Sequence, residues 1–377
     1  MRVVVLGAGF GGLELSTILS ERLGDDADVT LIDHGDAFVF GFSKLDVVFG
    51  HKTADAVRLP YADIAKPGVR FVKETITAID AEARSVTTDG GTYEGDALVI
   101  ALGADYDWDA TPGLAEADSE FYTVAGAERM ATRLTDFTGG RALIAVGGAP
   151  FKCPPAPSEA SMMLHDYLVA RGIRDSCEIT FALPLPSPVP PSPDTSRAFI
   201  AEFEQRGISF MPKSRLAAVD SGRGLATLDD GTELAYDLLL GVPRHRAPDV
   251  VLASGLVDDV YIPVDPRTLK TRFPGVYAVG DCAAVGVPKA GVFAEGAAKI
   301  VAASLIAEAE GAEHPDGYEG RGSCYVEFGG GRVARVDVDF LGGPEPTGTF
   351  QAPSTELAAE KKAFGTTRAA RWFGRDF

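Results

Sequence analysis

Two glycine-rich strand–turn–helix segments predict that the chain folds as an α/β protein. One segment runs from Arg2 to about Leu23 and the other begins at Arg141, and each opens on a short apolar run typical of a buried parallel strand. The length of 377 residues is enough for two or three domains. We therefore expect two Rossmann-like dinucleotide-binding domains, in the three-layer ββα arrangement, and a small C-terminal region.

Further apolar runs indicate how the chain is divided between these domains. Residues 98–103 (LVIALG) and 275–281 (GVYAVGD) both have the pattern of buried strands. Residues 69–79 and 83–88 are expected to form strands of a small antiparallel layer. The expected regions are a split first domain over 1–105 and 241–320, a second domain over 106–240, and a C-terminal region with a hairpin and a tail over 321–377.

Charge and cysteine content exclude several classes of protein. The formal net charge is −19, so the chain offers no basic field for nucleic acid. Four cysteines in so long a chain do not form a disulfide scaffold, and no metal site is expected. The chain opens on a strand-like run and has no apolar run of the roughly 20 residues that a spanning helix needs. A cytoplasmic protein with at most peripheral membrane contact is expected, and the oligomeric state, a homo-oligomer included, stays open.

The first glycine turn has the spacing of a dinucleotide-binding turn. Gly7, Gly9 and Gly12 fit the G-x-G-x-x-G pattern, in which bare backbone lets a pyrophosphate approach the N-terminus of a helix. The next strand ends at Asp33, in the place of a carboxylate that binds a ribose hydroxyl. Because the strand, helix, second strand and acid occur in order, a glycine turn without a ligand is the less favoured interpretation.

The second glycine turn departs from this pattern. It reads AVGGAPFKCPPAPSEASMM over residues 145–163, so the place of the third glycine is filled by a proline-rich segment that presents Cys153. The following strand, 177–183, leads into LPLPSPVPPSP, which has no acidic residue for a ribose. The second turn is therefore predicted to present a thiol in place of a pyrophosphate site.

Three stretches together are similar to the FAD signatures of flavoproteins built like disulfide reductases. They are GAGFGG at 7–12, LVIALGA at 98–104 and GVYAVGDCAAV at 275–285. The resemblance implies that the first domain binds FAD and that Gly103, Gly280 and Asp281 contribute to its site, with Asp281 at the ribityl and phosphate region.

The helix after Asp281 is implied by the same resemblance to point its N-terminus at the isoalloxazine. A helix N-terminus stabilises negative charge, as on a reduced flavin. Lys289, two residues before this helix, could add to that effect. The alternative for Lys289 is a solvated loop lysine.

Within this group the chain resembles the sulfide:quinone oxidoreductases and the flavocytochrome c sulfide dehydrogenases. Two local motifs carry this resemblance, FKCPPAPSE with Cys153 and GSCYVEFGGG with Cys324. The resemblance implies that the two cysteines face each other across the flavin as a disulfide or sulfur-bridged pair and relay sulfur from sulfide. Electrons would then pass through FAD to a quinone. The alternative is a pair of unrelated buried thiols.

Glu159, six residues after Cys153, matches the acid–base glutamate of that family. The resemblance implies that it moves a proton between sulfide and the thiol. A carboxylate near the start of a helix, stabilised by the helix dipole, is the alternative interpretation. Unlike many members, this chain has no further cysteine in residues 121–129.

Three other functions remain open at this point. The chain could be an NADH:quinone dehydrogenase of the same superfamily, which the altered second turn disfavours. It could be a flavoprotein subunit that passes electrons to a cytochrome. It could also be a flavin-fold redox sensor in which Cys153 and Cys324 form the switch.

The tail, residues 354–377, reverses the charge of the chain locally. Basic residues alternate with aromatic ones after residue 360, which is typical of an interfacial anchor on an anionic membrane. We therefore expect a membrane-binding tail, and the alternative is a tail packed on the acidic body of the protein or on a partner subunit. The residues concerned are Lys361, Lys362, Phe364, Arg368, Arg371, Trp372, Phe373, Arg375 and Phe377.

Overall fold

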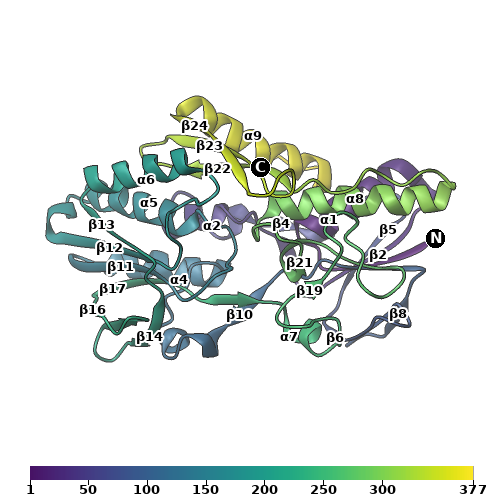
Figure 1. The fold of residues 1–377 in the computed structure, drawn as a ribbon, viewed down its shortest axis with the longest axis horizontal. Coiled ribbons are helices and arrows are strands. Elements are labelled where there is room, and N and C mark those ends of the chain that lie inside the picture. Colours follow the sequence, from purple (N-terminus) through teal and green to yellow (C-terminus); the bar gives the residue numbers. More distant parts are fainter. Residues whose placement is uncertain (377) are drawn as a thin grey trace.

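The computed structural model describes residues 1–376, and its N-terminal part is built on a five-stranded parallel sheet (Figure 1). The strand order is β20–β9–β1–β2–β5, so a strand from the last third of the chain pairs beside strands from the first third. The strands are β1 (Arg2–Leu6), β2 (Asp28–Asp33), β5 (Val69–Lys73), β9 (Ala97–Ile100) and β20 (Val276–Ala278).

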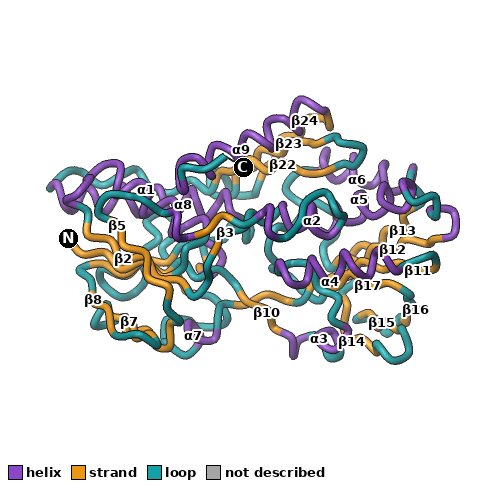
Figure 2. Tube along the Cα trace, turned by 180° about the vertical axis from the view of Figure 1, so that it is seen from behind, coloured by secondary structure: helices purple, strands orange, loops and turns teal. Residues whose placement is uncertain are grey.

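Helices and a second sheet cover the two faces of this sheet. Helices α1 (Phe10–Leu23) and α8 (Gly291–Glu310) lie on one face, and a small antiparallel sheet lies on the other (Figures 1 and 2). Burial on both faces explains why β1 and β9 read as continuous apolar runs. The antiparallel strands are β6 (Ile76–Asp80), β7 (Ser85–Thr88) and β8 (Thr92–Glu94).

The expected strand over residues 69–79 is wrong as a single element. Its first half, β5, pairs in parallel with β2, and only the second half, β6, joins the antiparallel layer. The chain changes sheets at Glu74, whose N–H donates to the Asp33 carbonyl, and at Thr75, whose N–H donates to Asp89 Oδ1. These two hydrogen bonds give the N–H groups of Glu74 and Thr75 their partners at the point where the chain passes from one sheet to the other.

A second parallel sheet carries the middle of the chain, in the order β13–β12–β11–β17. Helices α5 (Ala156–Ala170) and α6 (Pro193–Gln205) lie above it in Figure 1, and a three-stranded antiparallel sheet lies below. The parallel strands are β11 (Gly140–Val146), β12 (Cys177–Leu183), β13 (Ile208–Pro212) and β17 (Leu238–Val242), and the antiparallel ones are β14 (Leu216–Asp220), β15 (Leu225–Leu228) and β16 (Glu233–Ala235).

Two antiparallel strands connect the two halves. Strand β10 (Asp105–Asp107) leaves the first half and β18 (Arg244–Arg246) returns to it, and they pair with each other. The remaining elements are α2 (Ser43–Val48), α3 (Leu114–Ala117), α4 (Val124–Asp136), α7 (Asp249–Leu252), β3 (Ala37–Phe38) with β4 (Leu59–Pro60), and β19 (Ile262–Pro263) with β21 (Ala283–Ala284).

The C-terminal region lies across both halves along one side of the molecule (Figures 1 and 2). The expected hairpin is present as β22 (Arg321–Glu327) and β23 (Val333–Asp339), and a third strand, β24 (Thr347–Ser354), extends it. Strand β22 contacts α5 of the second half and α8 of the first half. The chain ends in helix α9 (Thr355–Phe373), whose N-cap Ser354 Oγ accepts a hydrogen bond from Leu357 N–H.

Helix α9 packs on the body of the protein, which is the alternative to the expected membrane-binding tail. Trp372 is 1% exposed, and its Nε1–H donates to Glu14 Oε2 at 3.0 Å. Acidic groups of the chain thus pair with four basic residues of the tail, and the core buries Trp372 and Phe373, while membrane contact stays a prediction. The ion pairs are Arg371 with Glu14 and Glu21, Arg368 with Glu295, Arg375 with Asp63, and Lys361 with Glu327. Phe377 lies outside the described residues.

None of the helices within residues 1–376 combines the length and the apolar composition that a membrane span requires.

Candidate active site

The first glycine turn is shaped by close backbone contacts that only glycine permits. Gly7 has φ +98°, and a Cβ on Gly12 would lie 1.9 Å from the Gly7 carbonyl oxygen. Gly9, the N-cap of α1, instead faces open space, and no side chain caps the helix. The free N–H groups of the first turn of α1 are thus open to a pyrophosphate, as the glycine spacing predicts.

Asp33 holds this turn from the end of β2. Its Oδ2 accepts a hydrogen bond from Ala8 N–H and its Oδ1 accepts one from Gly35 N–H, both at 2.8 Å. Each carboxylate oxygen keeps a further lone pair that can accept from a ribose hydroxyl. The carboxylate therefore can bind a ribose while it also fixes the turn.

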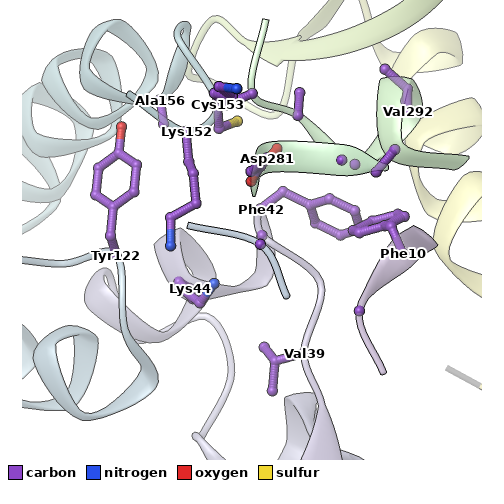
Figure 3. Close-up of a pocket in the computed structure, with 18 of the residues that line it drawn as sticks. Phe10, Val39, Phe42, Lys44, Tyr122, Lys152, Cys153, Ala156, Asp281 and Val292 are labelled. Carbon is purple, nitrogen blue, oxygen red and sulfur yellow. The ribbon is translucent and has the colours of Figure 1, made fainter. Parts of the chain in front are cut away.

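A cavity of about 360 Å³ lies where both halves meet the C-terminal sheet (Figure 3). It brings together most of the site residues that the sequence predicts, from segments that span more than 300 positions of the chain. Gly7, Gly12 and Asp33 shape the turn beside it. The predicted residues that line it are Gly9, Gly103, Cys153, Glu159, Gly280, Asp281, Lys289 and Cys324.

Three lysines line the same cavity around Asp281. Lys152 Nζ donates to the Ala104 carbonyl at 2.9 Å, and Figure 3 shows its ammonium directed toward Lys44. Burial lowers the pKa of Lys44 to about 8, with a further contribution from the charge of Lys152. Lys289 is 6% exposed and donates to the Ala283 carbonyl at 2.6 Å, so its interpretation as a solvated loop lysine is wrong.

The cavity fits FAD on these observations. Helix α8 begins at Gly291 after N-cap Ala290 without a capping side chain, and its first turn has no acidic residue. Its positive end and the three lysines together favour an anionic ligand such as a phosphate or a reduced flavin ring. Gly9 and Asp33 would hold the dinucleotide part, and Asp281 lies on the same cavity wall.

Cys153 is held in a strained conformation at the edge of the cavity. Its φ is +48°, which is rare for a residue with a side chain. Its N–H donates to the Lys289 carbonyl at 2.7 Å, and its carbonyl accepts from Ala156 N–H at 2.9 Å. The thiol loop of the second half is thereby tied to the segment that leads into α8 of the first half.

Cys324 reaches the cavity from strand β22, where it pairs with Val336 of β23. Both Cys153 and Cys324 are free thiols in this structure, so the predicted disulfide stays a prediction. Burial raises the pKa of Cys324 to about 12, and burial with the nearby Glu159 charge raises that of Cys153 further. A thiolate in this cavity therefore needs an adjacent base and hydrogen-bond donors.

Glu159 is placed to serve as that base. It is 3% exposed in the first turn of α5, lines the cavity, and accepts a hydrogen bond from Glu327 N–H at 2.9 Å through Oε1. Burial raises its pKa to about 7, although the charge of Lys361 opposes this shift. The carboxyl can therefore take or release a proton near neutral pH, in addition to its place near a helix start.

Several residues of the cavity have no counterpart in the sequence-based prediction. Lys361 was assigned to the tail, yet its Nζ pairs with Glu327 Oε1 at 2.6 Å and its side chain lines the cavity. Lys152 directly precedes Cys153, which is a local signal that could have identified it. Lys44 and Tyr122 have no such signal, because their places depend on contacts between distant segments.

The second glycine turn is covered by the chain itself. Gly147 and Gly148 are buried, and a Cβ on Gly147 would lie 2.5 Å from Thr111 Oγ1. The aliphatic part of Arg244, from strand β18, lies against Gly148, and its guanidinium pairs with Asp107. These contacts occupy the place where a dinucleotide would approach the backbone, which agrees with the altered sequence of the turn.

The fold and the cavity define a flavoprotein oxidoreductase with two dinucleotide-binding folds, one of them modified to carry a thiol. A sequence model of the pyridine nucleotide-disulphide oxidoreductase family matches residues 1–304, and the chain belongs to this family. It is an FAD-dependent enzyme, and the predicted α/β fold is confirmed.

Among its relatives are named sulfide:quinone oxidoreductases, so the resemblance inferred from the cysteine motifs is confirmed. The mitochondrial sulfide:quinone oxidoreductase of Mus musculus is 25% identical, over 92% of this chain and 80% of that one. The sulfide-quinone reductase of Aquifex aeolicus is 27% identical, over 87% of this chain and 81% of that one. An NADH dehydrogenase-like protein of Mycobacterium tuberculosis is 30% identical, over 75% and 73% of the two chains.

The solved structures give the same fold. The crystal structure of the sulfide:quinone oxidoreductase from Aquifex aeolicus superimposes with a TM-score of 0.85 and 23% identity, over 96% of this chain and 89% of that one.

Proposed function

We propose that this enzyme oxidises sulfide through Cys153 and Cys324 and passes the electrons through FAD to a quinone. The observation that carries the proposal is that two thiols 171 positions apart and Glu159 line one cavity, beside the uncapped N-terminus of α8. The names of two relatives supply the substrate and the acceptor.

The sulfur chemistry begins from a disulfide between Cys153 and Cys324. Hydrosulfide attacks Cys153 Sγ, the disulfide bond breaks, and a persulfide on Cys153 and a thiolate on Cys324 form. A second hydrosulfide attacks the outer sulfur, so that Cys153 leaves as a thiolate and hydrogen disulfide forms. Proton transfer from hydrogen disulfide to this thiolate gives a hydrodisulfide anion and the Cys153 thiol. Closing this thiol and the Cys324 thiolate into the disulfide again releases two electrons and one proton. Bound FAD supplies the acceptor for this electron pair.

The protein's own groups support each step. Glu159, with a pKa of about 7, accepts the proton released when the disulfide closes. Lys361 lines the cavity, and the positive charge of its ammonium favours the approach of the hydrosulfide anion. The bond from Cys153 N–H to the Lys289 carbonyl keeps the attacked sulfur in its loop position.

The test is an anaerobic titration of the purified flavoprotein with sulfide and, separately, with NADH, followed by flavin absorbance. Sulfide is expected to bleach the flavin within seconds, and a soluble quinone is expected to restore it. Faster bleaching by NADH would contradict the proposal. Bleaching by sulfide without reoxidation by quinone would point instead to a cytochrome acceptor or to a redox sensor.

An NADH:quinone dehydrogenase is the second candidate. The 30% identity to an NADH dehydrogenase-like protein favours it. The burial of Gly147 and Gly148 under Thr111 and Arg244 opposes it, because NADH binding at a Rossmann turn requires bare backbone. The NADH arm of the same titration decides between the two candidates.

A further inference from the structure

Tyr122 lines the cavity, and within residues 1–376 its hydroxyl makes no interaction that stabilises the fold. It lies just before α4, is 7% exposed, and lines the cavity with both cysteines and Glu159. Among the described residues, no group forms a hydrogen bond with its hydroxyl. A buried hydroxyl without a partner is costly, so its retention in the cavity indicates a ligand or a reacting group that it serves.

The ring of Tyr122 is held firmly in place. Its backbone N–H donates to the buried carboxylate of Glu120 at 2.7 Å. The ring packs at a tilt against Phe121, with centroids 5.0 Å apart, and edge-on against His245, with centroids 5.4 Å apart. The His245 Nε2 is itself without a partner in the described part of the chain, so this imidazole does not satisfy the phenol. The hydroxyl is thus pre-positioned but unpaired.

The hydroxyl lies on the side of the cavity that carries the Cys153 loop. Figure 3 shows the oxygen of Tyr122 at the end of the ring next to Ala156, three residues after Cys153, whereas the Lys152 ammonium is directed away from this end, toward Lys44. Burial raises the pKa of Tyr122 well above its usual value, and the charge of Cys153 is the next largest cause. The phenol therefore stays protonated and can only donate toward a nearby anionic sulfur.

The surroundings of Cys153 explain why such a donor is needed. Its own N–H already donates to the Lys289 carbonyl, so that group cannot stabilise a negative sulfur. A hydrogen bond to a charged acceptor is roughly twice as strong as one between neutral groups.

We propose that the Tyr122 hydroxyl donates a hydrogen bond to the anionic sulfur of Cys153, the thiolate that forms when the second hydrosulfide takes the outer sulfur of the persulfide. This role rests on the proposed function and adds a catalytic residue to it. No covalent bond to the tyrosine forms, and its proton stays on the phenol oxygen.

The test is the rate of alkylation of Cys153 in Tyr122→Phe, in a Cys324→Ser background that prevents disulfide formation. Iodoacetamide is the probe, mass spectrometry identifies the modified cysteine, and the rate is measured from pH 6 to pH 11. Because a hydrogen bond to a charged group is lost, we expect alkylation of Cys153 to slow by about tenfold at a fixed pH, with its pH profile shifted upward. Tyr277→Phe is the matched control, since Tyr277 is also buried but donates to Glu308 Oε1 away from the cavity.

An alkylation profile that is identical in Tyr122→Phe and the parent would overturn the proposal. Flavin content and melting temperature check that the variant is folded, and Tyr122→Leu is measured in the same way if Tyr122→Phe loses its flavin. In the chain with both cysteines, Tyr122→Phe is expected to slow flavin reduction by sulfide about tenfold. A parent protein that does not respond to sulfide contradicts the proposed function alone, because alkylation still reports on the bond between Tyr122 and Cys153.

Discussion

The two glycine turns of the molecule begin from the same strand–turn–helix arrangement and differ in what the tertiary structure places over them. Over the first turn, Gly9 faces open space and α1 begins without a cap. Over the second, Gly147 and Gly148 are buried beneath Thr111 and Arg244, and the loop that follows carries Cys153 in a strained conformation.

This difference teaches that a Rossmann turn is a binding site only where its backbone is bare. The first turn keeps free N–H groups for a dinucleotide, whereas in the loop after the second turn the N–H of Cys153 donates to the Lys289 carbonyl. Once that turn no longer needs to cradle a phosphate, its loop can present a side chain to the cofactor site of the other half. The predictions below test this contrast.

The largest effect is expected from Gly12→Ala in the first turn. A Cβ there would lie 1.9 Å from the Gly7 carbonyl oxygen, and a backbone atom of a tight turn cannot move away. We expect a protein that purifies with little or no flavin, as measured by the ratio of absorbance at 450 and 280 nm. Gly91→Ala is the control, because nothing lies within 4 Å of a Cβ at that position. A Gly12→Ala protein with full flavin content would contradict the assigned role of the first turn.

Cys153→Ser is expected to retain its flavin but to lose sulfide-dependent flavin reduction by about three orders of magnitude or more, as for other nucleophiles whose removal ends a covalent mechanism. Stopped-flow absorbance at a fixed sulfide concentration measures the rate. Cys177→Ser is the control, since Cys177 is buried and its thiol donates to the Ile173 carbonyl outside the cavity. Rapid reduction of the Cys153→Ser flavin by sulfide would remove the thiol from the mechanism.

Glu159→Gln is expected to lower the same rate by about a hundredfold, which is the range for removal of a general base. The pKa of Glu159 is raised to about 7, so the carboxyl is protonated below this pH and accepts a proton only above it. With hydrosulfide held constant at each pH, the rate of the unmodified enzyme should rise through pH about 7, and the rate of Glu159→Gln should lack this rise. The same inflection in both proteins would assign it to another group.

The smallest effect is expected from Gly148→Ala in the second turn. A Cβ there would meet Arg244 side-chain carbons at 3.0 to 3.2 Å, and this flexible side chain can shift. We expect full flavin content, unchanged sulfide-dependent reduction and a loss of stability below about 1 kcal/mol, measured by thermal unfolding. Loss of flavin comparable to that of Gly12→Ala would show that the two turns are still equivalent.

Local patterns in the sequence were enough to predict the first turn and most of the strands. The glycines, the apolar runs and Asp33 interact with one another within a single βαβ unit. All the residues that determine this local structure therefore lie in one short stretch of sequence. The prediction of one strand over residues 69–79 is wrong because its two halves pair with different strands, β5 with β2 and β6 with β7. Neither neighbour is visible in the stretch itself.

The sequence by itself therefore determined an FAD-type turn, a second turn without its third glycine, and two cysteine motifs. Only the tertiary structure decided that Cys153, Glu159 and Cys324 line one cavity, that Tyr122 and Lys361 join them, and that α9 packs inward. The physical reason is that burial and charge pairing depend on groups from distant segments. The basic tail, which resembles a membrane anchor in isolation, is paired because Glu14 and Glu295 lie on α1 and α8 beneath it.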